Sequence, residues 1–130
     1  ILILDLLTLM HEKKADYTNT FCHLMGANSK KDIIFEDKYF INWKKRWKER
    51  LLKNSNSPDK CINLMRNSNP LVIPRNHKVE EALEAAEQNN MKPIKKILEI
   101  LNKPYTEQKN LVDYQSPSTT SEKYQTFCGT

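Results

Sequence analysis

The chain has 130 residues, of which 38% are apolar and 28% are charged, and its formal net charge at pH 7 is +5. A chain of this length buries about two thirds of its unfolded surface, which is enough for one domain with its own core. The only glycines are Gly26 and Gly129, which excludes the glycine-rich loops that cradle nucleotide phosphates. The three cysteines lie far apart without a C-x-x-C spacing. We therefore expect no disulfide framework or zinc knuckle and a reducing, cytoplasmic location.

The N-terminal residues predict two short helices. Asp5 interrupts the first apolar stretch, which is too short to cross a bilayer and has no basic region before it. We interpret this apolar opening as the middle of a helix in a longer protein. Asp16 is expected to cap a second helix that runs to about Leu24 and ends at Gly26. The inward residues of the first helix, at helical spacing, are Leu2, Leu6, Leu9 and Met10.

A longer, basic helix is predicted from about Glu36 to Lys53. Its apolar stripe steps by three, four and four residues through Phe40, Trp43, Trp47 and Leu51. A basic helix with tryptophans can bind nucleic acid or an anionic membrane surface, and a helical binding module for nucleic acid or protein is our alternative function. We favour a solvated basic face opposite a tryptophan-rich core, because the tryptophans align with the other apolar residues. The basic residues are Lys38, Lys44, Lys45, Arg46, Lys48, Arg50 and Lys53.

A short helix is predicted after a polar break at residues 54–57. Ser57 followed by Pro58 is typical of a helix start, with proline at the first helical position. The residues expected to face inward are Cys61, Ile62 and Met65.

The most distinctive segment is Asn69–Ala86, in which a proline-braced stretch leads directly into a helix. Pro70 and Pro74 each fix their own backbone and hold residues 71–73 extended. Asn76 is the predicted N-cap of the helix, whose inward residues are Val79, Ala82, Leu83 and Ala86. This arrangement places three polar side chains, Arg75, Asn76 and His77, at a rigid corner.

The last predicted helix begins at Pro93 and closes at Pro104. It forms an antiparallel hairpin with the preceding helix. Its inward residues are expected to be Ile94, Ile97, Leu98 and Leu101. Strand patterns are nearly absent, so the fold class is all-α, with about five to six short helices in an orthogonal or bundle-like arrangement. Residues 1–105 form the helical domain, and residues 106–130 an extended or irregular tail.

Candidate reactive residues are few. The histidines His11, His23 and His77 lie far apart, and we predict no metal site and no catalytic triad. For His77, a capping or interface hydrogen bond is favoured over a ligand-binding role. Cys22 and Cys61 fall within helix patterns and are expected to be buried and inert. Cys128 lies in the tail, where a thiol can reach a partner, and is the candidate redox residue.

Seven motifs occur in order along nearly the whole chain, and together they resemble the C-terminal region of the selenoprotein O family (SelO, also called YdiU). One departure is Cys22, where the family pattern has arginine. The motifs are Asp16-Tyr-Thr-Asn-Thr-Phe21, Phe40-x-x-Trp43 with Trp47 and Arg50, Met65-Arg-Asn-Ser-Asn-Pro70, Ile73-Pro-Arg-Asn-His77, Val79-Glu-Glu-Ala-Leu-Glu-Ala-Ala86, Lys103-Pro-Tyr105 and Tyr124-x-Thr-Phe-Cys-Gly-Thr130.

The resemblance implies a pseudokinase-like protein adenylyltransferase, which uses ATP with magnesium or manganese to move AMP onto hydroxyl side chains of protein substrates. Its catalytic and nucleotide-binding residues belong to an upstream kinase-like portion, so this chain carries none of them and is expected to be inactive alone. Cys128 matches the position of selenocysteine in some members. Arg75, Asn76 and His77 become candidates for hydrogen bonds at the interface with the kinase-like portion, and neither nucleic acid nor a membrane is an expected partner.

Overall fold

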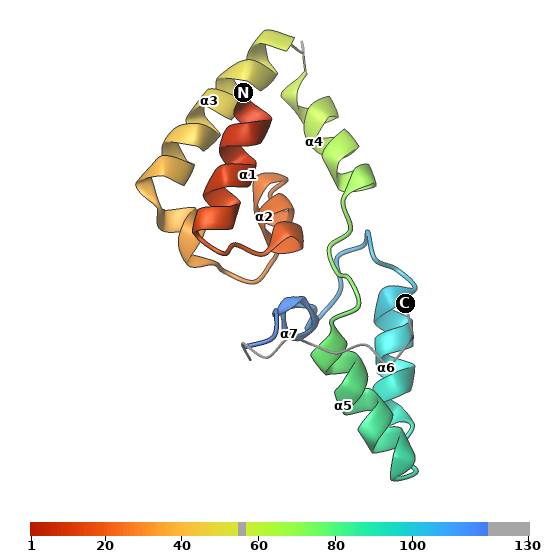
Figure 1. Cartoon of the computed structure of the whole chain (residues 1–130). Coiled ribbons are helices and arrows are strands. Elements are labelled where there is room, and N and C mark those ends of the chain that lie inside the picture. The colour runs from red at the N-terminus through yellow and green to blue at the C-terminus, as the bar shows by residue number, and fades with distance from the viewer. Residues whose placement is uncertain (55–56, 120–130) are drawn as a thin grey trace.

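A computed structural model describes residues 1–54 and 57–119 (Figure 1). These residues contain no strand, so the all-α prediction is confirmed, although the seven α-helices exceed the five to six expected. The additional element is a single turn of helix near residue 112. In chain order the elements are α1 (Leu2–Glu12), α2 (Tyr17–Leu24), the 3-10 helix η1 (Ile33–Glu36), α3 (Lys38–Asn54), α4 (Pro58–Ser68), α5 (Asn76–Glu87), α6 (Lys92–Leu101) and α7 (Val112–Gln115).

The helices form two groups joined by the proline-braced segment at residues 69–75. In Figure 1, α1 to α4 make up the upper group, and α4 diverges from the end of α3. The lower group consists of the antiparallel α5–α6 hairpin, which confirms the predicted hairpin, with α7 lying between the two groups. The contact between the groups therefore depends on residues 69–75 and on α7.

A first core fills the upper group, where α1 packs along α3. It confirms the predicted stripe: Phe40 and Trp43 are buried, and Trp47 packs partly buried against them. Aromatic rings dominate such cores because each one removes a large apolar area from water. The Trp43 indole nitrogen Nε1 donates a hydrogen bond to the carbonyl of Leu2 at 2.8 Å, which ties α3 to the start of α1. The other buried members are Leu6, Met10, Leu24 and Ile34.

A second core lies where the two groups meet. The prediction for α6 was wrong at Leu98, which is 62% exposed, and it missed Ile100, which is only 2% exposed. The other predicted inward residues, Ile94, Ile97 and Leu101, are partly buried. Ile100 packs against the proline-braced segment and the stretch before α7, which periodicity along α6 alone does not reveal. Leu83 of α5 is also exposed rather than inward. The buried members of this core are Cys22, Met25, Leu71, Val72, Ile100 and Leu111.

The helix ends follow their local signals with two exceptions. The predicted side-chain cap at Asp16 is confirmed, and α4 begins at Pro58 as predicted, with Ser57 in the N-cap position. Helix α3 begins two residues later than predicted, because the Asp37 carboxylate accepts a hydrogen bond from the Tyr39 N–H at 2.8 Å and thus caps it. The N-cap of α5 is Arg75 and not Asn76, since the Arg75 backbone is extended and Asn76 is already helical.

The C-terminal segment differs from an irregular tail over its described part. Residues 112–115 form the short helix α7, and Leu111 and Gln115 are both buried. The candidate redox residue Cys128 lies outside the described residues. The longest described helix, α3, has 17 residues, and no helix in the described part combines the length and apolar character needed to span a bilayer.

Candidate functional site

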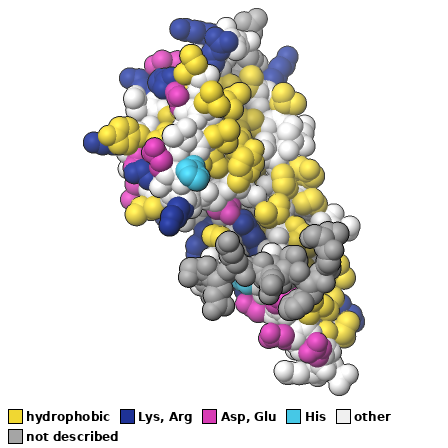
Figure 2. Space-filling model, in the orientation of Figure 1, with side chains coloured by type: hydrophobic (Ala, Val, Ile, Leu, Met, Phe, Trp, Pro, Cys, Tyr) yellow, Lys and Arg dark blue, Asp and Glu magenta, His cyan; other side chains and the backbone are white. Residues whose placement is uncertain are grey.

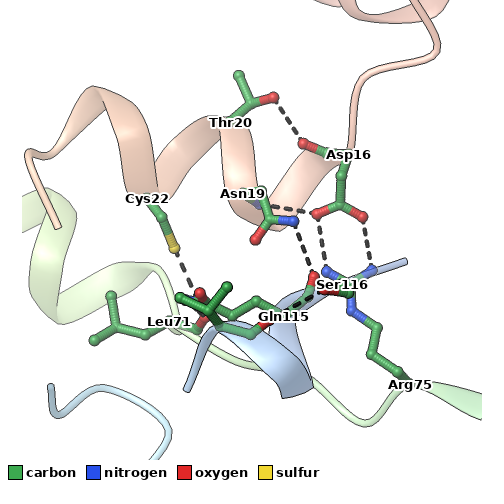
Figure 3. Close-up of polar contacts among 9 residues, drawn as sticks. Asp16, Asn19, Thr20, Cys22, Leu71, Arg75, Gln115 and Ser116 are labelled. Carbon is green, nitrogen blue, oxygen red and sulfur yellow. Dashed lines mark hydrogen bonds and ion pairs between the residues drawn. The ribbon is translucent and has the colours of Figure 1, made fainter. Parts of the chain in front are cut away.

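The proline corner joins α5 to the start of α2 through a buried ion pair. Arg75 donates two hydrogen bonds to Asp16, from Nη1 to Oδ2 at 2.6 Å and from Nη2 to Oδ1 at 2.9 Å. The side chains are only 11% and 12% exposed. Figure 3 shows the guanidinium of Arg75 below the carboxylate of Asp16, joined to it by the two hydrogen bonds, at the start of α2. This bidentate geometry fixes both distance and orientation between the two helix groups.

Asp16 has two structural roles at this position. Its Oδ1 also accepts a hydrogen bond from the Asn19 N–H at 2.9 Å, which caps α2. Burial raises the pKa of the Asp16 carboxyl, but the hydrogen bonds and charge of Arg75 and the Asn19 N–H outweigh it, so the pKa lies below its ordinary value. Asp16 is therefore held as a carboxylate, and its charge is neutralised within the chain.

Gln115 of α7 adds further hydrogen bonds where the two helix groups meet, close to the Asp16–Arg75 pair. It is fully buried, and its Nε2 donates to the carbonyl oxygens of Leu71 at 2.8 Å and Asn28 at 3.3 Å. Its own backbone carbonyl accepts from Asn19 Nδ2 at 2.9 Å. One glutamine thus links α2, the proline-braced segment and α7 (Figure 3). Sequence reasoning missed Asn19 and Gln115, because their partners lie 44 to 96 residues away and no local pattern marks them.

Cys22 lies beside this junction as a buried thiol. Its sulfur contacts the carbonyl oxygens of Pro70 at 3.7 Å and Leu71 at 3.8 Å. Burial, assisted by the negative charges of Glu107 and Asp16, raises the pKa of the Cys22 thiol to about 11. The expected burial of Cys22 is confirmed, and because the thiolate is the reactive form, the raised pKa supports the prediction of an inert thiol. Cys61 differs from the expectation, since it is only partly buried.

The three polar residues of the corner do not converge. Arg75 points inward to Asp16, Asn76 is exposed, and His77 is partly buried. His77 lines an open hollow of about 560 Å³ between the start of α5 and the end of α7, together with Lys78, Glu81, Asp113, Tyr114 and residues 116–119. The structure therefore separates Arg75, which holds the chain together, from Asn76 and His77, which remain candidates for an interface.

A second polar contact involves His23, at the meeting point of α2, η1 and α3. The His23 ring stacks on Phe35 with 3.9 Å between centroids, and its Nε2 lies 2.9 Å from Lys44 Nζ. Burial lowers the pKa of His23, and the Lys44 charge lowers it further. The neutral ring accepts the lysine's hydrogen bond. His23 therefore belongs to the packing of the upper helix group.

Most basic residues of α3 lie on its solvent side, with the exception of Lys44, which is half-buried beside His23. Lys45, Lys48, Arg50 and Lys53 are exposed, while the tryptophans of the same helix lie in or against the core. The favoured interpretation, a solvated basic face opposite an aromatic core stripe, is confirmed. Within residues 1–54 and 57–119, no three His, Cys, Asp or Glu side chains gather as a metal site would require.

The fold and the site define an all-α module in which buried polar residues hold two helix groups together. The chain belongs to the SelO family, because the family model described as protein adenylyltransferase SelO matches residues 1–102. This confirms the resemblance that the motifs carry. No solved structure matches the chain.

Three relatives are named protein nucleotidyltransferase YdiU and match 99% of this chain. They come from Pelagibacter ubique (46% identical over 130 residues), Clostridium botulinum (47% over 132 residues) and Alcanivorax borkumensis (45% over 131 residues). The chain spans about 27% of the length of each of them. It therefore corresponds to one part of a SelO-type protein.

Proposed function

We propose that this chain is a non-catalytic helical part of a SelO-type protein adenylyltransferase. The whole protein transfers AMP from ATP, with magnesium or manganese, to hydroxyl side chains of protein substrates. In this reaction the substrate oxygen attacks the α-phosphorus, pyrophosphate leaves, and the hydroxyl proton passes to a base in the kinase-like portion. The family match and the name that the relatives share support the class of reaction.

The supporting role rests on one observation, the buried Asp16–Arg75 ion pair. A charged side chain that serves catalysis is directed at a site that substrate can reach, whereas these two neutralise each other at 2.6 Å between α2 and α5. The described polar network is thus organised to fix helices relative to each other. A rigid module of this kind is suited to supporting the kinase-like portion.

Radiolabel transfer tests the proposal. The full-length protein, supplied with magnesium or manganese, is expected to incorporate label into protein from α-labelled ATP and not from γ-labelled ATP. The isolated 130-residue chain is expected to incorporate neither. Label transfer by the isolated chain, or failure of the full-length protein to transfer the α-label, would refute the proposal.

The tail thiol Cys128 is proposed as a redox residue of the same protein, on the strength of the family resemblance. A two-electron thiol oxidant such as diamide is expected to join it to a cysteine of the kinase-like portion, with loss of two thiol protons and reduction of diamide to the hydrazine. Peptide mass mapping would then find Cys128 in a disulfide. A free Cys128 thiol after full oxidation would contradict this role.

A further inference from the structure

Helix α1 is apolar on two sides, and residues 1–54 and 57–119 cover only one of them. Seven of its eleven residues are apolar, in the sequence LILDLLTLMHE. Leu6 and Met10 are buried against α3. On another side Ile3 is 74%, Leu4 66% and Leu7 43% exposed. A helix that is hydrophobic nearly all round is typical of a position buried on all sides.

The exposed residues form one continuous face. Ile3, Leu4 and Leu7 are neighbours on a helical surface, because residues three and four apart lie one turn above each other. Figure 2 shows hydrophobic side chains gathered over the part of the molecule where α1 lies in Figure 1. Contiguous exposed apolar surface of this kind marks an interaction site, in contrast to single exposed leucines.

The orientation of α1 is fixed, so this face cannot turn into the core. The Leu2 carbonyl accepts the hydrogen bond from Trp43, and the Asp5 carboxylate pairs with Arg46 Nη1 at 3.0 Å. These contacts, with the buried side chains, join α1 to α3 along most of its length. Among the described residues nothing covers this outer face, so it stays in solvent until a surface from elsewhere covers it.

We propose that the outer face of α1, Ile3, Leu4 and Leu7, docks onto an apolar surface of the rest of the SelO polypeptide. This inference rests on the proposed function. The lengths of the relatives indicate what covers this face. The chain matches only about 27% of each relative, so most of each relative's polypeptide lies outside the matched region. A surface tethered to the same chain has a high effective concentration, which favours it over a second copy. The docked surface is aliphatic or aromatic, since the three leucine and isoleucine side chains offer it no polar partner.

Site-specific photocrosslinking in the full-length protein tests this docking. A benzophenone amino acid replaces Leu4, and in a matched variant it replaces Thr8, which lies one turn further along α1 and lines the groove between α1 and α3. Circular dichroism of both variants establishes that each is folded. The Leu4 probe is expected to join, within one polypeptide, to peptides outside the 130 residues. The Thr8 probe is expected to join to α3, near Tyr39 and Asn42.

Three outcomes at Leu4 would overturn the inference: crosslinks only within the 130 residues, crosslinks only to a second copy, or no peptide crosslink while Thr8 reacts with α3. The crosslink map does not depend on catalysis. Loss of AMP transfer with the Leu4 crosslink intact would therefore count against the proposed function alone, and active protein without that crosslink would count against the docking face alone.

Discussion

Replacing Arg75 by alanine tests whether the Asp16–Arg75 pair holds the two helix groups together. The change removes both hydrogen bonds, at 2.6 and 2.9 Å, and leaves the Asp16 carboxylate buried with the Asn19 N–H as its remaining partner. Both side chains are nearly 90% covered. Breaking a buried pair by removing one partner costs about 3 kcal/mol or more, because an uncompensated charge stays out of water. We expect a loss of about 3 kcal/mol in the free energy of unfolding.

The chain contains a matched control in Arg46→Ala. Arg46 also pairs with an aspartate, Asp5, at 3.0 Å, but these side chains are 47% and 36% exposed. Water and salt screen such a pair, so its loss is expected to cost less than about 1 kcal/mol. Urea unfolding near pH 7, followed by circular dichroism and by the fluorescence of Trp43 and Trp47, measures both losses on one scale.

A double-mutant cycle and a pH series complete the experiment. Arg75→Ala combined with Asp16→Asn is expected to cost less than the sum of the single changes, because the two residues interact directly. Since the pKa of Asp16 is lowered on folding, the pair's stabilisation is complete above the ordinary aspartate pKa and is lost as pH falls through the lowered value. If Arg75→Ala cost no more than Arg46→Ala, or the cycle gave no coupling, the argument for a buried junction would be wrong.

Three further predictions concern single residues. Because the pKa of His23 is lowered on folding, the unfolded chain takes up a proton first as pH falls through about 6.5, so urea midpoints should drop between about pH 7.5 and about pH 5.5; an equal drop in His23→Gln would contradict this. Cys22 should react with iodoacetamide only after unfolding, while the partly buried Cys61 reacts in the native chain, as peptide mass spectrometry can measure; equal native rates would sink the assignment. Gly26→Ala should lower the free energy of unfolding by about 1 kcal/mol, and Gly26→Asn by less, because the backbone φ of +69° is unfavourable for alanine and better tolerated by asparagine. An added Cβ causes no clash, since its nearest atom would be 3.9 Å away. Urea midpoints unchanged by alanine would show that this backbone conformation is not required.

The sequence was sufficient to predict a structural feature wherever the interaction that causes it lies within a few residues along the chain. Asp16 caps α2 because its carboxylate reaches the N–H three residues later. The Trp43 stripe faces the core because helical periodicity places it there. The Gly26 stop holds for the same reason, since the Ala27 N–H reaches back to the Cys22 carbonyl at 3.0 Å around the left-handed glycine.

Predictions failed where the burial or pairing of a residue depends on segments that are distant in the sequence. Leu98 and Ile100 are two residues apart and lie on opposite edges of the apolar stripe of α6, and only the packing against Leu71 and Leu111 decides that Ile100 is the buried residue. Arg75 was predicted to form interface hydrogen bonds with the kinase-like portion, because nothing near it in the sequence shows that it has a partner 59 residues away in the same chain. Long-range partners of this kind leave no periodic pattern in a single sequence.

The sequence by itself determined the all-α class, most of the helix starts and the family, because caps, prolines, apolar spacing and ordered motifs are local properties. Only the tertiary structure decided how the proline corner is used. It turns Arg75 inward to Asp16, leaves Asn76 outside, and inserts Gln115 between the helix groups. The physical reason is that a buried charge or amide requires a partner, and the partner's identity depends on which distant segments the folded chain brings within hydrogen-bond distance.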